Sequence, residues 1–121
     1  MFDWAEFLNL ADALVQQTNQ AALRSAVSRA YYATYHRALG KLVDEGQIHR
    51  SDPSQPGKHK AMWDLYRDSA DDKRRRVGIN GDRLRKDRTN ADYNDAFEVK
   101  APTAKQCVSS AISLCQAIQQ L

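Results

Sequence analysis

The chain has 121 residues and a net charge of +3, with 27% charged and 42% hydrophobic residues. This composition is typical of one ordinary globular domain, so we interpret residues 1–121 as a single domain. No apolar run approaches the roughly 20 residues that a membrane-spanning helix needs, and the first residues lack the basic and apolar regions of a signal peptide. The sequence therefore argues against a membrane protein and favours a cytoplasmic location.

Two helices are predicted in the first part of the chain. Apolar residues recur at helical spacing over residues 4–15, directly after Asp3, a residue type that favours helix N-termini. A second helix is expected from Asn19 to about Glu45, with Gly46 as its stop. Because the connection between them is short, we expect the two helices to pack antiparallel.

A loop and a third helix are predicted next. Two prolines and a glycine indicate a loop over residues 47–57. The third helix follows over about residues 58–70, where apolar side chains again recur on one side.

The last part of the chain is predicted to contain two further helices. We interpret residues 77–81 as a helix breaker, followed by a short fourth helix over about 82–90 and an extended connection over 91–101. Pro102 suits the first turn of a final helix, which carries an apolar seam as far as Leu121. No segment alternates with a period of two residues, so the predicted fold class is all-α.

The second predicted helix carries an unusual polar stripe. At about 100° per residue, Ser25, Arg29, Tyr32 and His36 fall on one side, and the opposite side is apolar. Small residues flank the stripe and would let another helix come close. We therefore expect a central helix, with one face in the core and the other at a partner or a site.

Residues 73–88 concentrate the positive charge of the chain. They hold eight basic and two acidic residues, a local charge of +6, which leaves −3 for the remainder. Arginine dominates, and its planar fork suits bidentate phosphate contacts. A solvated helix face is an equally compatible interpretation. The candidate nucleic-acid-binding residues are Arg74, Arg75, Arg76, Arg83, Arg85 and Arg88.

The sequence contains none of the common cofactor or metal motifs. It has no glycine-rich phosphate loop and no nucleophile elbow. Its three histidines show no metal-ligand spacing. Cys107 and Cys115 lie eight residues apart in a helical pattern, too far for a disulfide with each other. We therefore predict no cofactor, no metal site and reduced thiols.

Two stretches of this chain resemble the HEPN family of small all-helical proteins. The similarity lies in Ser25–Ala33 followed by His36, and in Arg85–Arg88 followed by Ala91-Asp92-Tyr93. The resemblance implies an up-and-down bundle of four main helices with a shorter extra one, usually a homodimer. It also implies an RNA or nucleotide ligand and a role in stress, toxin–antitoxin or defence systems. Several family members pair with a nucleotidyltransferase, which we therefore expect as a candidate partner.

Many members of that family are metal-independent ribonucleases, in which an arginine and a following histidine meet their counterparts across the dimer. Arg88 matches the arginine, but Tyr93, Asn94 and Asp95 occupy the positions where the histidine would fall. The resemblance therefore implies weak or no activity by that route. Our leading hypothesis is a HEPN-like module that binds RNA or a nucleotide.

Two alternatives stay open, so the sequence does not decide whether the chain is an enzyme. The first is an active metal-independent ribonuclease that uses Arg29, His36 and Arg88. His36 would take the proton of a ribose 2′-hydroxyl, and an arginine would stabilise the charged transition state. The second is a protein-interaction module with no nucleic-acid role. The side chains expected to support the ribonuclease site are Tyr32, Asp92 and Tyr93.

Each of these residues also has a structural interpretation. A buried Arg29 would need a carboxylate, which Asp92 could supply. A lone histidine on a helix, such as His36, more often packs than acts as a general base. Tyr93 is expected to be an anchor that packs its ring and satisfies the hydrogen bonding of its hydroxyl.

Overall fold

The structure is a computed structural model that describes residues 1–49 and 58–121. These residues form five α-helices and no strand, which confirms the predicted all-α class. Most of the loop predicted over 47–57 lies outside the described residues. The helices are α1 (Ala5–Leu14), α2 (Gln20–Asp44), α3 (Lys58–Arg67), α4 (Asp72–Tyr93) and α5 (Ala101–Gln119).

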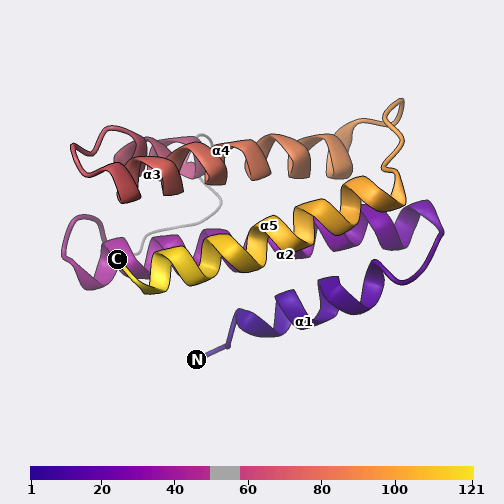
Figure 1. Ribbon diagram of the computed structural model, residues 1–121, viewed down its shortest axis with the longest axis horizontal. Helices are drawn as coiled ribbons and strands as arrows, with labels where there is room; N and C mark the ends of the chain where they lie inside the picture. Colours follow the sequence, from indigo (N-terminus) through magenta and orange to yellow (C-terminus); the bar gives the residue numbers. More distant parts are fainter. Residues whose placement is uncertain (50–57) are drawn as a thin grey trace.

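The helices form a bundle of three layers (Figure 1). α2 and α5 lie together in the middle layer, α1 covers one side of them, and α3 and α4 cover the other. The chain reverses direction between α1 and α2 and again between α4 and α5. α2 packs against α1, α4 and α5, so it is the central helix that its sequence predicts. None of the helices in the described ranges is long and apolar enough to cross a membrane.

The start of α1 and both ends of α2 lie at the predicted local signals, although the N-cap residue of α1 is Trp4 and not Asp3. Asp3 Oδ1 accepts a hydrogen bond from the backbone nitrogen of Ala5 at 3.0 Å, where α1 begins. Asn19 Oδ1 accepts one from the backbone nitrogen of Ala22 at 2.9 Å. Gly46 ends α2 with a φ of 74°, a left-handed conformation that glycine adopts without steric cost.

Aromatic side chains attach α3 to α2. Tyr31, Trp63 and Tyr66 are completely buried. The indole nitrogen of Trp63 donates to the hydroxyl of Tyr31 at 3.0 Å, and the hydroxyl of Tyr66 donates to the carbonyl oxygen of Ala38 at 2.7 Å. These contacts bury large apolar rings while their polar atoms keep hydrogen-bond partners.

The helix break predicted over 77–81 is wrong, because α4 is continuous from Asp72 to Tyr93. Gly78 and Gly81 are buried and lie against α3. A Cβ atom at Gly81 would lie 2.2 Å from the ring of Trp63, and one at Gly78 would lie 2.5 Å from the backbone of α3. The two glycines therefore mark a close contact between helices and not a turn.

Two other predicted boundaries also change. α3 ends at Arg67 and not at Ala70, and Asp71 caps the next helix directly afterwards. The connection predicted over 91–101 shortens to 94–100, because α4 continues through its first three residues.

The last helix buries the predicted apolar seam. Both cysteines are free and lie on it. Burial raises the pKa of Cys107 to about 12, with a further contribution from the carboxylate of Asp87, and burial also raises the pKa of Cys115. Both thiols are therefore protonated and unreactive at neutral pH. The buried residues of α5 are Ala104, Cys107, Val108, Ala111, Leu114, Cys115 and Ile118.

Candidate functional site

Several cations of the basic segment are already paired within the fold. The guanidinium of Arg74 binds both carboxylate oxygens of Glu45, at 3.0 and 2.7 Å, and holds the pKa of Glu45 below its usual value. Arg75 forms an ion pair with Asp72 one turn earlier in α4. Arg74, Arg75 and Arg76 therefore do not form one binding unit, although the sequence places them together.

A second group of ion pairs converges on Asp82, a buried carboxylate of α4. Arg85 Nε lies 2.8 Å from it, Arg67 Nη1 3.3 Å and Lys86 Nζ 3.4 Å. Burial alone would raise the pKa of Asp82, but the hydrogen bond from Arg85 and the charges of Arg85 and Lys86 outweigh burial and lower it. Arg85, a predicted nucleic-acid contact, is thus engaged within the protein.

Arg88 lies in the interior, where only 9% of its surface is exposed. Its guanidinium carbon lies 5.1 Å from the ring centre of Tyr31 and 5.5 Å from that of Tyr32, within the range of cation–π contacts. Its Nη1 atom is 3.8 Å from the carboxylate of Asp92. A free polyanion would have little access to a cation in this position.

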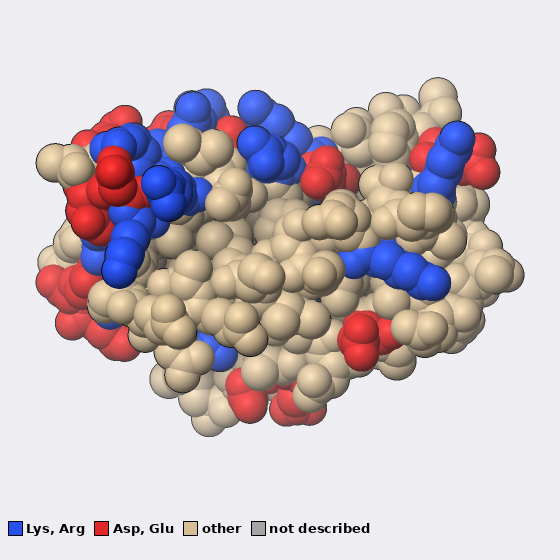
Figure 2. Space-filling model, in the orientation of Figure 1, with Lys and Arg blue, Asp and Glu red and all other residues tan. Residues whose placement is uncertain are grey.

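Lys73, Arg76 and Arg83 are the cations of the segment that remain. All three are exposed, and none forms an ion pair within the described residues. All three line one groove of about 630 Å³ between α4 and α5. Figure 2 shows Lys and Arg side chains gathered over α4, beside an almost uncharged band over α5.

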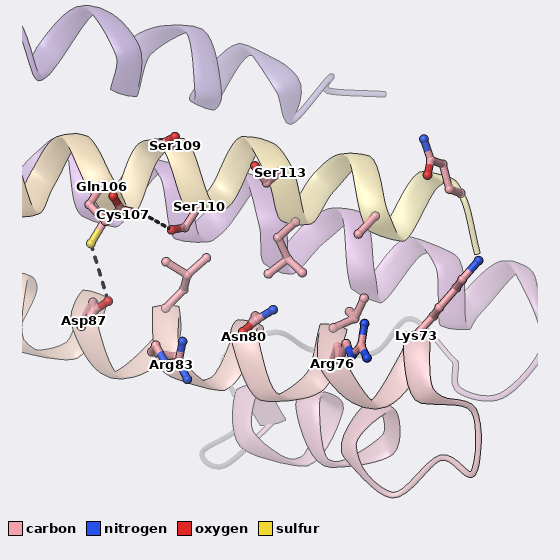
Figure 3. A pocket seen from close by; sticks show the side chains of 15 residues that line it. Lys73, Arg76, Asn80, Arg83, Asp87, Gln106, Cys107, Ser109, Ser110 and Ser113 are labelled. Carbon is pink, nitrogen blue, oxygen red and sulfur yellow. Dashed lines mark hydrogen bonds between the residues drawn. The ribbon is translucent and has the colours of Figure 1, made fainter.

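One wall of the groove comes from α4. Lys73, Arg76, Asn80 and Arg83 follow one another at helical spacing, so their side chains emerge on one face. From Lys73 to Arg83 this row extends about 15 Å along the helix axis, at 1.5 Å per residue. In Figure 3 the side chains of Lys73, Arg76, Asn80, Arg83 and Asp87 follow one another along α4.

The floor and the opposite wall carry no positive charge. Val77, Leu84 and Leu114 contribute apolar surface. Residues 101–121, which include all of α5, hold one charged side chain, Lys105, which does not line the groove. The polar side chains of α5 that line it include Gln106 and Ser110, on the side toward α4, and Ser109 and Ser113, at the outer edge away from α4 (Figure 3).

An acidic residue closes one end of the groove. Asp87 accepts a weak hydrogen bond from the thiol of Cys107 at 3.5 Å. It is the one acidic side chain among the described lining residues, against three cations. An anionic ligand would therefore be attracted to the part of the groove between Lys73 and Arg83.

The predicted catalytic residues point toward different parts of the bundle. The guanidinium of Arg29 lies 4.9 Å from the ring centre of Phe7 in α1. The ring of His36 stacks on Trp4, just before α1, with ring centres 3.5 Å apart. These contacts direct Arg29 and His36 toward α1, whereas Arg88 packs on Tyr31 and Tyr32, as described above.

The supporting residues also take other positions than expected. Asp92 accepts a hydrogen bond from Ser28 Oγ at 3.2 Å and lies beside Arg88, while no ion pair joins it to Arg29 among the described residues. The expected packing of Tyr93 is wrong, because its side chain is 72% exposed at the end of α4.

His59 lies outside the groove, in a partly buried cluster of aromatic side chains that the sequence did not indicate. Its Nδ1 atom lies 2.8 Å from the hydroxyl of Tyr31, and its ring stacks on Tyr35 with ring centres 4.0 Å apart. Burial, assisted by the charge of Arg88, lowers the pKa of His59 to about 4. His59 is therefore neutral at pH 7. His59 lies in the first turn of α3, and no sequence motif indicates that it contacts α2.

Comparison with known proteins gives no further constraint, because no protein-family model, curated protein or solved structure matches the chain. Within residues 1–49 and 58–121, no three His, Cys, Asp or Glu side chains gather where they could hold a metal ion. The groove between α4 and α5 is thus the candidate site, on the basis of its own geometry and charge.

Proposed function

We propose that the chain is a HEPN-like helical module that binds RNA or a nucleotide through the groove between α4 and α5. The observation that supports this function is the division of the basic segment. Its paired cations lie outside the groove, and Lys73, Arg76 and Arg83, which lack ion-pair partners in the described structure, all line it. A role in a stress, toxin–antitoxin or defence system, a homodimer and a nucleotidyltransferase partner rest on the sequence resemblance.

The chemistry of the three cations fits phosphate. Arg76 and Arg83 can each present two parallel N–H donors to one phosphate group, and Lys73 supplies a compact charge. Binding would release counterions from the nucleic acid, so affinity should fall steeply as salt is added.

Replacing Lys73, Arg76 and Arg83 together by Gln should weaken RNA binding and reduce its dependence on salt. Each lost phosphate contact removes about 0.7 unit for a single strand, or about 0.9 unit for a duplex, from the slope of log K against log salt, so we expect a reduction of about two to three units for three contacts. Fluorescence anisotropy of a labelled RNA hairpin with a single-stranded tail, measured at several salt concentrations, would give both quantities.

A matched control replaces Lys60, Arg75 and Lys86 by Gln. These exposed side chains carry the same total charge and do not line the groove. Because these three charges are paired with Asp64, Asp72 and Asp82 and do not line the groove, this variant should lose less affinity and less of the salt slope than the groove variant does. Equal losses in both variants, or no binding by the unchanged protein at low salt, would contradict the proposal.

We do not expect the chain alone to cleave RNA. Arg29 and His36 are directed toward α1, and Arg88 is buried against aromatic rings, so the described contacts favour binding over catalysis. The same hairpin, incubated with the protein in EDTA, should stay intact on a denaturing gel. Cleavage that disappears in His36→Ala and persists in Tyr93→Phe would instead establish the ribonuclease alternative.

A further inference from the structure

We propose that the groove between α4 and α5 holds the sugar–phosphate backbone of a single nucleic-acid strand, and not a mononucleotide or a duplex. This inference rests on the proposed function and specifies its ligand. It follows from the spacing of Lys73, Arg76 and Arg83, from the chemistry of the facing wall, and from the absence of aromatic side chains among the lining residues.

The spacing of the cations favours a chain of phosphates over one nucleotide. Lys73 and Arg83 are ten residues apart on one helix face, which separates their backbones by about 15 Å. One phosphate group, or the adjoining phosphates of one nucleotide, would contact both ends of this row only if the two long side chains turned toward each other along the helix axis. A stacked strand, which rises about 3.4 Å per nucleotide, spans this length with four to five nucleotides.

The lining side chains also disfavour a pocket for an isolated base. Proteins commonly hold free or splayed bases by stacking them on aromatic rings. Among the described residues that line this groove there is no Phe, Tyr, Trp or His. Bases would therefore face outward, and affinity would depend little on their sequence.

The distribution of charge favours one strand over two. All the cations of the groove stand in one row on α4, and α5 faces them with serine and glutamine side chains. A duplex presents two rows of phosphates, of which this single row of cations could contact only one. Here the apolar floor of Val77, Leu84 and Leu114 can accept the faces of sugar rings, while the hydroxyl groups of α5 can bond to sugar oxygens.

Competition experiments with the full chain test this inference. The protein would be bound to a labelled 15-nucleotide RNA strand, and five unlabelled competitors would be added separately at equal concentrations of negative charge. The competitors are an RNA strand, a DNA strand, an RNA duplex, a nucleoside triphosphate and polyglutamate. We expect both strands to compete at least about tenfold better than the other three. A single strand releases about 0.7 counterion per phosphate contact, so three contacts should give a slope of log K against log salt of about −2.

Comparing the RNA strand with the DNA strand shows whether the groove recognises ribose or only the phosphate backbone that both strands share. A preference for RNA that is lost in Gln106→Ala/Ser110→Ala, which removes the two polar side chains of α5 on the side toward α4, would assign these groups to the ribose 2′-hydroxyl. Equal competition by RNA and DNA would assign the groove to phosphate and the common part of the sugar. Either result supports a single-strand groove.

Other outcomes overturn the inference in distinguishable ways. If duplex or nucleoside triphosphate competes as well as the strand, the single-strand inference fails while the proposed function stands. If polyglutamate competes equally, the groove accepts acidic polypeptide, and the proposed function and the single-strand inference both fail. Both also fail if the protein binds no labelled RNA. Arg76→Gln and Arg83→Gln, tested singly, change exposed side chains and keep the site testable if the triple variant folds poorly.

Discussion

Replacing Gly81 by Ala should lower the free energy of unfolding by about 2–3 kcal/mol, although alanine favours an isolated helix by about 1 kcal/mol. The added methyl group would lie 2.2 Å from the ring of Trp63, well inside van der Waals contact. Trp63 is completely buried, and its indole donates to Tyr31, so the ring cannot move away without losing that hydrogen bond. Overpacking of this kind typically costs 1–3 kcal/mol.

Urea unfolding followed by circular dichroism would measure this loss. Thr89→Ala, on an exposed part of the same helix, is the matched control and should change stability by less than about 0.5 kcal/mol. A double-mutant cycle with Trp63→Leu isolates the contact, because a smaller side chain makes room for the methyl group. Additive losses in that cycle, or an unchanged Gly81→Ala, would show that the close approach of α3 and α4 is not what requires glycine.

Acidification from pH 7 to pH 4.5 should destabilise the protein by roughly 2 kcal/mol through His59 alone. The pKa of His59 is about 4 in the folded chain, against 6.5 for an ordinary histidine. Between these values the unfolded chain binds a proton that the folded chain does not. The stabilisation is therefore complete above about pH 6.5 and is lost progressively as the pH falls toward 4.

Unfolding midpoints at several pH values would test this pH dependence. His59→Gln keeps a polar side chain beside Tyr31 and does not titrate, so it should lose about 2 kcal/mol less than the unchanged protein over the same range. His49→Gln replaces an exposed histidine and should follow the unchanged protein. Carboxylates that begin to protonate near pH 4.5 affect all three proteins alike. Parallel curves for all three proteins would rule out His59 as the source.

Much of the fold could be predicted because its signals are local. The side chain of Asn19 and the left-handed Gly46 set the ends of α2 within a few residues of where they stand in the sequence. The glycines of α4 misled the prediction for a physical reason. Glycine gives the same sequence signal whether it breaks a helix or lets another helix approach, and here the helix that approaches carries Trp63, eighteen residues before Gly81.

The candidate site could be predicted only in part. The charge of residues 73–88 is visible in the sequence, but the pairing of Arg74 with Glu45 joins residues 29 positions apart. Lys73, Arg76 and Arg83 have helical spacing, but this pattern places them on one face only if the helix is continuous, and the sequence was predicted to break at 77–81. The environment of His59 depends on Tyr31, in another helix, and no local pattern indicates it.

The ion pairs of α4 also determine how the molecule would meet a polyanion from a distance. Arg74 and Arg75 are each paired with a carboxylate, and Arg85 and Lys86 share Asp82, whereas Lys73, Arg76 and Arg83 have no such partner within the described residues. These three cations together carry +3, which equals the net charge of the whole chain, so the remaining residues sum to zero and the groove is the side of the molecule with an excess of positive charge. The resulting electric dipole exerts a torque as well as an attraction. A negatively charged partner would therefore rotate the protein into alignment before the first contact forms, and most encounters would begin with the groove already facing it.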